Sequence, residues 1–203
     1  DSLDYHSAQH IHFVAEAERR VYADRSEFMG DMDFVPVPID RLISDEYANN
    51  RWESVDSLSA SKSEDVSHGD IPFNYKESEE TTHYSVVDQW GNAVSVTTTI
   101  NGWFGNGIVV DGAGFLLNNE MDDFSAKPGV PNAYGLVGNS ANAIEPGKRM
   151  LSSMSPTIVE TPEGELFLVL GSPGGSTIIT TVAQIIMNVI DFGMNMEDAV
   201  ETP

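Results

Sequence analysis

The stretch that decides the fold is TTHYSVVDQWGNAVSVTTTI, residues 81–100. Its two halves, residues 82–87 and 93–100, are rich in the β-branched and aromatic residues that favour strands. Between them, Gln89-Trp90-Gly91-Asn92 is typical of a turn. The pattern therefore predicts a β-hairpin with its first strand beginning at residue 82.

Upstream of this hairpin the chain is polar and then helical. Residues 56–80 are rich in Ser, Asp, Glu and Lys and end in Glu77-Ser78-Glu79-Glu80, which predicts a linker or mobile segment. Apolar residues recur at helical spacing from about Ser7 to Ser26. Ser44-Asp45-Glu46 indicates the start of a second helix that runs to about Val55.

Downstream, the elements alternate between strands, loops and helices. Residues 125–149 have little periodicity and predict a long loop. The predicted elements are a short strand at Gly114 to Leu117, a hairpin of Thr157 to Glu160 with Leu166 to Leu170, a helix from Thr177 to Ile190, and a last helix from the cap Asn195 to about Val200. This order predicts an α+β fold with helices packed on antiparallel sheets.

Composition excludes several classes of function. The 203 residues include 32 acidic and 10 basic side chains, for a net charge of −22. Such a surface repels nucleic acid and anionic membranes. There is no cysteine, which excludes disulfides, thiolate zinc sites and a cysteine nucleophile. No apolar run reaches the roughly 18 residues of a membrane span, and we expect the chain to be truncated at both ends.

Familiar catalytic motifs are also missing. Gly-x-Ser-x-Gly is absent, and so is His-Glu-x-x-His. His6, His10 and His12 lie close together in the sequence, but we interpret them as helix surface or packing residues. The sequence predicts no metal site and no cofactor.

The glycine-rich segment Gly171-Ser172-Pro173-Gly174-Gly175 has three interpretations. A turn of this kind between a strand and a helix can bind phosphate, although no lysine follows Gly175. It can be purely structural. It can also form an oxyanion hole, with the amides of Gly174 and Gly175 directed at a developing negative oxygen. The residues alone leave these alternatives open.

Thr81 lies where the acidic segment meets the first strand. A threonine hydroxyl in mid-chain is an ordinary polar group, and most threonines at strand starts are structural. If the preceding bond is cleaved, the free α-amine can serve as the base for that hydroxyl. This chemistry requires no histidine, metal or cysteine.

Several segments resemble gamma-glutamyltranspeptidases, in the order of that family and over nearly the whole chain apart from the linker. The segment from Thr81 to Asp88 resembles the start of the family's small subunit, and ERRVYADR at 18–25 is similar to the end of its large subunit. The other matching segments are LLNNEMDDF at 116–124, KPGVPN at 127–132, LSSMSPT at 151–157 and GSPGGS at 171–176.

The resemblance implies an N-terminal nucleophile hydrolase with a four-layer αββα sandwich, incomplete in this fragment. Residues 1–80 would be the C-terminal part of the large subunit, with an acidic mobile linker at about 56–80. Residues 81–203 would be the small catalytic subunit, truncated at its C-terminus. Self-cleavage between Glu80 and Thr81 would activate the zymogen. Thr81 would then take a γ-glutamyl group from amides such as glutathione and pass it to water or to an amino acid or peptide.

The resemblance also implies roles for individual residues. The catalytic set would be Thr81, Thr99, which orients the nucleophile, and the oxyanion-hole glycines Gly174 and Gly175. The residues that bind the substrate's α-amine and α-carboxylate would be Asn101, Glu120, Asp123, Ser152 and Ser153. Pro128 to Gly138 would form a lid that carries Tyr134, at the position that touches Asn101. The family's carboxylate-binding arginine has no counterpart in this chain.

Two alternatives remain at this point. Related N-terminal nucleophile families cleave poly-γ-glutamate or act on β-lactam side chains, and a chain with these motifs can also be an unprocessed, inactive module. The expected partners are a small γ-glutamyl substrate, an amino acid or peptide acceptor, and the large subunit paired with the small one. We expect no nucleic acid and no membrane insertion. The resemblance implies a periplasmic or extracellular location.

Overall fold

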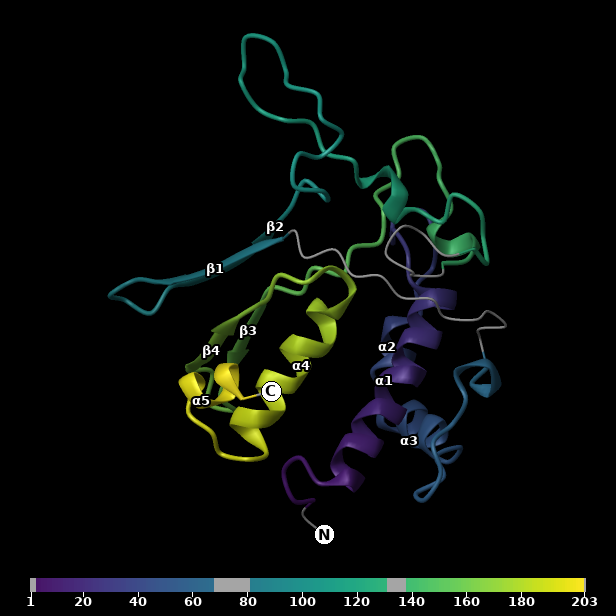
Figure 1. Cartoon of the computed structure of the whole chain (residues 1–203). Helices are drawn as coiled ribbons and strands as arrows, with labels where there is room; N and C mark the ends of the chain where they lie inside the picture. The colour runs from purple at the N-terminus through teal and green to yellow at the C-terminus, as the bar shows by residue number, and fades with distance from the viewer. Residues whose placement is uncertain (1–2, 68–80, 131–137, 203) are drawn as a thin grey trace. The chain divides into compact units, whose positions relative to one another are not determined.

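The computed structural model describes residues 3–67, 81–130 and 138–202 (Figure 1). Its contacts divide the chain into two compact units. Unit 1 comprises Asp1–Lys76 and Met121–Leu151, and unit 2 comprises Glu77–Glu120 and Ser152–Pro203. Each unit therefore contains two separate stretches of sequence.

Unit 1 is built on helices that begin at the predicted caps. The helices are α1 (Ala8–Phe28), α2 (Ile39–Leu42) and α3 (Asp45–Trp52), with short 3₁₀ turns η1 (Ser63–Asp65) and η3 (Ser140–Asn142). The hydroxyl of Ser7 accepts from the amide of His10 at 3.1 Å, which confirms the start of the first predicted helix. Ser44 accepts from the amide of Tyr47 at 3.2 Å in the same way. The helix that follows Ser44 ends at Trp52, slightly before the predicted end.

Hydrogen bonds from the segment after α3 secure it to α1. The Glu16 carboxylate is fully buried and accepts from the Arg20 guanidinium at 2.7 Å. It also accepts from the amide of Ser61 at 2.9 Å and from its hydroxyl at 2.6 Å. Arg20 donates further to the hydroxyl of Ser54 at 2.8 Å. The first part of the predicted linker is thus bonded to α1, while residues 68–80 lie outside the described residues.

A second ion pair joins the two stretches of unit 1. The Arg149 side chain donates to both oxygens of Asp31, at 2.6 and 3.1 Å, and its amide adds a bond of 2.8 Å. These hydrogen bonds from Arg149 hold the pKa of Asp31 well below its usual range. The contact spans 118 positions of sequence and helps to close the unit.

Unit 2 contains two antiparallel hairpins at the predicted positions. β1 (Thr82–Val87) pairs with β2 (Ala93–Thr98), and β3 (Thr157–Glu160) pairs with β4 (Leu166–Leu170). The Asp88 carboxylate accepts from the amides of Trp90 and Asn92 at 2.8 and 2.9 Å and so closes the first turn. The second strand stops at Thr98, two residues before the predicted end.

Helix α4 (Ile178–Ile190) supplies the apolar core of unit 2. Figure 1 shows it beside the β3–β4 hairpin, with α5 (Met196–Glu201) close by. Ile178 is only 1% exposed. The buried cluster consists of Leu168, Leu170, Ile178, Val182, Ile185 and Ala199. A helix packed on an antiparallel hairpin confirms the predicted α+β arrangement.

One strand prediction is wrong. Residues 114–117 form no strand, although Leu116 makes an isolated antiparallel bridge with Val109. The amide of Val110 donates to the carbonyl oxygen of Phe115 at 2.8 Å, and the amide of Leu117 donates to that of Ile108 at 3.0 Å. Gly112 and Gly114, both with a left-handed φ of 75°, belong to the turn between these two segments, so the extended stretch is shorter than predicted. Among the helices that the structure describes, none combines the length and apolar character required to cross a membrane.

Candidate active site

Thr81 lies immediately before β1 and is half-buried. The paired residues of β1 and β2 run from Val87 opposite Ala93 to Thr82 opposite Thr98. Thr81 directly precedes the first paired residue of β1, and Thr99 directly follows the last paired residue of β2. Both predicted catalytic threonines therefore lie next to the end of the hairpin at which Thr82 pairs with Thr98.

Asn101 connects Thr99 to the loop that carries Glu120. The Thr99 hydroxyl accepts from the Asn101 amide at 2.9 Å. Asn101 is buried, has a left-handed φ of 73°, and donates through Nδ2 to the carbonyl oxygen of Asn119 at 3.2 Å. The Asn119 side chain in turn accepts from the amide of Gly102 at 2.8 Å. These bonds fix the loop around Asn101.

Glu120 begins the 3₁₀ turn η2 (Glu120–Asp123). Its amide donates to the side-chain oxygen of Asn118 at 3.0 Å, so that the turn is capped locally. Burial raises the pKa of the Glu120 carboxyl, because the charged form loses contact with water. The side chains of Asn118 and Asn119 are not among the predicted site residues. Their position as a pair directly before Glu120 is the signal that would have found them.

Asp123 belongs to unit 1. Its carbonyl oxygen accepts from Nδ2 of the buried Asn142 at 2.7 Å. Burial lowers the pKa of Arg25, while the phenol of Tyr22 and the carboxylate of Asp123 act in the opposite direction. The Asp123 carboxylate therefore lies in the electrostatic range of the half-buried Arg25 guanidinium.

Gly174 and Gly175 form the turn between β4 and α4. Their φ angles are 126° and 55°, which other residues rarely adopt. The hydroxyl and the amide of Thr177 donate to the carbonyl oxygen of Gly174, at 2.8 and 3.0 Å. A Cβ on Gly174 would lie 2.8 Å from the Thr177 hydroxyl. Both glycines precede α4 through the short turn η4 (Gly175–Thr177), and the first amides of a helix have no acceptor within it.

Ser152 and Ser153 precede β3. The Ser152 side chain is exposed and its hydroxyl accepts from the amide of Met154 at 3.1 Å. Ser153 is half-buried, and its carbonyl oxygen accepts from the hydroxyl of Ser155 at 3.1 Å. Tyr134 and most of the predicted lid lie outside the described residues.

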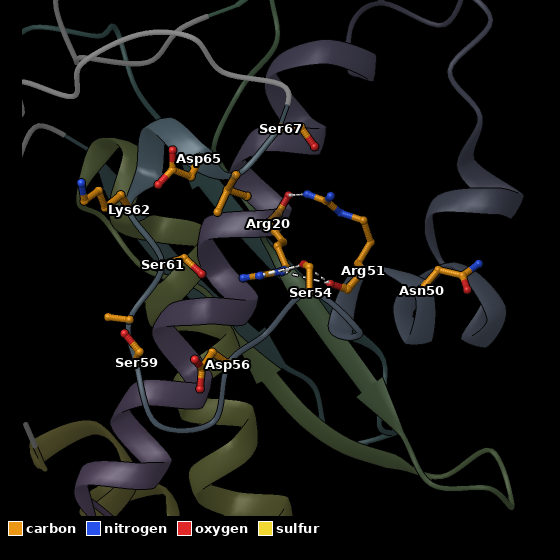
Figure 2. Close-up of a pocket in the computed structure, with 12 residues that line it drawn as sticks. Arg20, Asn50, Arg51, Ser54, Asp56, Ser59, Ser61, Lys62, Asp65 and Ser67 are labelled. Carbon is orange, nitrogen blue, oxygen red and sulfur yellow. Dashed lines mark hydrogen bonds between the residues drawn. The ribbon is translucent and has the colours of Figure 1, made fainter.

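A pocket of about 500 Å³ lies in unit 1, among α1, α3 and residues 54–67 (Figure 2). Its two guanidinium groups are engaged: Arg20 with Glu16 and Ser54, and Arg51 with Asp24 at 3.1 Å. None of the predicted site residues lines it. Over the described ranges, no cluster of three or more His, Asp or Glu side chains is arranged to hold a metal ion.

Comparison with known proteins identifies the family. The family model "Gamma-glutamyltranspeptidase" matches residues 1–203. The glutathione hydrolase proenzyme of Escherichia coli strain K12 is 55% identical over 198 residues, which cover 97% of this chain and 33% of that protein. The corresponding proenzyme of Pseudomonas aeruginosa is 54% identical over 198 residues, with 98% and 34% covered. The chain therefore spans about a third of the length of these curated relatives.

Solved structures agree with this result. A crystal structure of a mutant gamma-glutamyltranspeptidase from Helicobacter pylori aligns with a TM-score of 0.58 at 69% identity, over 60% of this chain and 65% of that one. The fold is that of the N-terminal nucleophile hydrolases. Within that class, the chain belongs to the gamma-glutamyltranspeptidase family.

Proposed function

We propose that this chain carries the self-cleavage site and the nucleophile of a γ-glutamyl transferase and hydrolase that acts on glutathione-like amides. The observation that carries the proposal is Thr81 directly before β1, next to the end of the hairpin at which Thr82 pairs with Thr98, in a chain 55% identical to a glutathione hydrolase proenzyme. Residues 1–80 then belong to the large subunit, with the acidic linker at 56–80. Residues 81–203 belong to the small subunit, and the two subunits stay paired after cleavage.

Self-cleavage begins with the Thr81 hydroxyl. Its oxygen attacks the carbonyl carbon of Glu80, the peptide C–N bond breaks, and the Thr81 nitrogen takes up the hydroxyl proton. The product is an ester of Glu80 on the threonine oxygen. Water then hydrolyses this ester, which leaves a carboxylate on Glu80 and a free α-amine on Thr81. The chain thereby acquires the base that the mature nucleophile requires.

Turnover uses the same oxygen on a different carbonyl. The free amine accepts the hydroxyl proton while the Thr81 oxygen attacks the γ-carbonyl carbon of the substrate. The γ-amide C–N bond breaks, and the amine of the leaving group receives the proton. A γ-glutamyl ester remains on Thr81, with Thr99 orienting the nucleophile. Attack by water gives glutamate, and attack by the amine of an amino acid or peptide gives a new γ-glutamyl amide.

The tetrahedral intermediate in this scheme carries a negative oxygen, which the amides of Gly174 and Gly175 stabilise. Their location just before α4 supports this role, because the amino end of a helix favours negative charge. Removing one such donor from an enzyme typically costs about 100-fold or more in kcat.

Recognition of the glutamyl head requires local groups, because a surface of net charge −22 repels anions. The carboxylates of Asp123 and Glu120 and the side chain of Asn101 bind the α-amine. The hydroxyls of Ser152 and Ser153 bind the α-carboxylate. A lid formed by residues 128–138, with Tyr134, covers the site. The protein acts in the periplasm or outside the cell.

Intact mass of the full-length protein and its Thr81→Ala variant tests the proposal. We expect the wild type to give two chains that meet between Glu80 and Thr81, and to release the aniline from a short γ-glutamyl anilide. Thr81→Ala should remain uncut and inactive. Thr82→Ala, at the first residue of β1, should cleave itself and turn over the substrate. A Thr81→Ala protein that cleaves itself and turns over substrate contradicts the proposal, as does turnover limited to poly-γ-glutamate or an acyl β-lactam.

A further inference from the structure

His83 lies on β1, two residues after Thr81, and its ring contacts both hairpins of unit 2. Nδ1 lies 2.8 Å from the hydroxyl oxygen of Thr97 on β2, and Nε2 lies 3.1 Å from that of Ser85. The Ser85 hydroxyl donates to the carbonyl oxygen of Val169 on β4 at 3.1 Å. The hydrogen bonds therefore run from β2 through the ring of His83 to β4.

These contacts define where the ring carries its proton. A hydroxyl has a single proton, and Ser85 gives its proton to Val169, so the Ser85 oxygen accepts from Nε2–H of His83. Nδ1 is hydrogen-bonded to the Thr97 hydroxyl. Hydrogen bonds at both ring nitrogens fix the plane of the ring.

Gly171, the first residue after β4, packs directly against this ring. A Cβ at Gly171 would overlap the ring atoms Cε1 and Nδ1 of His83. The φ of Gly171 is not in the left-handed region, so glycine is required here for space and not for backbone conformation. The Gly171 backbone therefore rests on a side chain of the strand that begins beside Thr81.

We infer that His83 is a positioning residue, which sets the distance between the Thr81 oxygen and the amides of Gly174 and Gly175. The ring packs against Gly171, which lies three and four residues before Gly174 and Gly175. The strand that carries His83 begins directly after Thr81. The inference rests on the proposed function of Thr81. A donor must lie within a few tenths of an ångström of its best distance to stabilise an oxyanion, and a shift of about 1 Å costs on the order of 100-fold in rate.

The experiment compares kcat and KM in the full-length protein for wild type and His83→Ala, with a γ-glutamyl anilide as substrate. We expect kcat to fall about 100-fold, as for a misplaced oxyanion donor. KM should change by less than about threefold, because Thr97 and Ser85, to which the ring is bonded, are not among the proposed substrate-binding residues. A γ-boronic acid analogue of glutamate, which forms a tetrahedral adduct on a hydroxyl, should lose affinity by the same factor as kcat.

Further variants locate the effect. Gly171→Ala displaces the ring from the other side and should reproduce the loss of kcat. Thr97→Val keeps the shape of β2 while removing the partner of Nδ1, and should lower kcat about tenfold, as expected for one hydrogen bond of roughly 1 kcal/mol or more. Tyr84→Phe, on the opposite face of β1, should leave kcat unchanged. A variant that stays uncut is produced as two chains that meet at Thr81, so that turnover is measured without the processing step.

The outcomes separate the two proposals. Wild-type protein that neither cleaves itself nor releases aniline from the γ-glutamyl anilide contradicts the proposed function. Wild-type activity together with a His83→Ala kcat within about threefold of it overturns the positioning role. A lower melting temperature with unchanged kcat and boronate affinity also overturns it, since that result describes packing alone.

Discussion

The two units solve the same packing problem with different interiors. Unit 1 buries charged and polar side chains, with Glu16, Arg20 and Asp24 all on the inner face of α1. Unit 2 buries an aliphatic cluster between α4 and β4, centred on Ile178. The difference shows that a helix can be secured by directed hydrogen bonds or by apolar area. Only the first of these depends on ionisation.

The energetics of the two interiors differ in kind. Burying apolar area contributes about 25 cal/mol per Å², with no directional requirement. A buried ion pair must first overcome the desolvation of both charges, so that its net contribution is small until one partner is removed. Unit 1 should therefore respond more sharply to the loss of a single charge, and unit 2 to the loss of volume.

The largest expected effect is at Glu16. Glu16→Ala leaves the Arg20 guanidinium buried beside an empty space and removes the acceptor of Ser61, so we expect unit 1 to lose about 4 kcal/mol of stability. Hydrogen exchange resolved by peptide should locate the loss to α1 and residues 54–61. Glu64→Ala removes an exposed carboxylate, 3.9 Å from Lys62, and is the matched control, with an expected change under about 0.5 kcal/mol. Equal effects of the two substitutions would contradict a charged interior.

The corresponding test in unit 2 is Ile178→Ala. Truncating this side chain opens a cavity in the cluster with Leu168 and Val182, and we expect a loss of about 3 kcal/mol. The loss should be the same at pH 7 and pH 4, because no ionisable group takes part. Ile190→Ala, at the exposed end of the same helix, should cost about 1 kcal/mol or less. A strong pH dependence of the stability loss in Ile178→Ala would contradict the view that the interior of unit 2 does not depend on ionisation.

Lowering the pH should destabilise unit 1 before it destabilises unit 2. Burial alone would raise the pKa of Glu16, but hydrogen bonds from Ser61 and Arg20 outweigh it and lower the pKa from 4.5 to about 2. A lowered pKa stabilises the folded state above pH 4.5, and this contribution is lost as the pH falls towards 2. Hydrogen exchange between pH 5 and pH 2.5, corrected for the intrinsic rate, should show α1 losing protection before α4. The Glu16→Gln variant should weaken that dependence, and simultaneous loss in both helices would contradict it.

The smallest expected effect is one that both units should share. Ser44 caps α3 in unit 1 and Asn195 caps α5 in unit 2, where its side chain accepts from the amide of Asp198 at 2.9 Å. Replacing either by Ala should cost about 1 kcal/mol. Because caps act at exposed helix ends, the cost should not depend on the kind of interior. Glycine at either position should restore most of the loss, and a clear difference between the units would show that the caps also carry tertiary contacts.

Most local signals in the sequence predict the structure correctly, whereas the long-range contacts could not be predicted from it. The caps at Ser7, Ser44 and Asn195 and the strands at 82–87 and 166–170 depend on neighbours a few positions away. The burial of Glu16 could not be predicted, because its partner Ser61 lies 45 positions along the chain. A glutamate on a helix is ordinarily taken to face solvent.

The candidate site shows the same difference between local patterns, which can be predicted, and long-range contacts, which cannot. The position of Thr81 directly before a paired strand follows from the hairpin, which is a local pattern. The packing of Gly171 on His83 joins two hairpins far apart in sequence, and no spacing rule connects them. The strand predicted at residues 114–117 is wrong for a local reason, because Gly114 belongs to a turn and leaves an extended stretch that makes only an isolated bridge.

The register of the first hairpin has an evolutionary consequence. The turn from Asp88 to Asn92 sets the pairing of β1 with β2, which ends at Thr82 opposite Thr98, directly after Thr81. Adding or deleting one residue there would bring a different neighbour opposite Thr82 and turn alternate side chains to the other face of the sheet. Selection should therefore tolerate substitutions in this turn much more readily than changes in its length. Over generations, insertions and deletions should be as rare between the two strands as replacement of Thr81 itself.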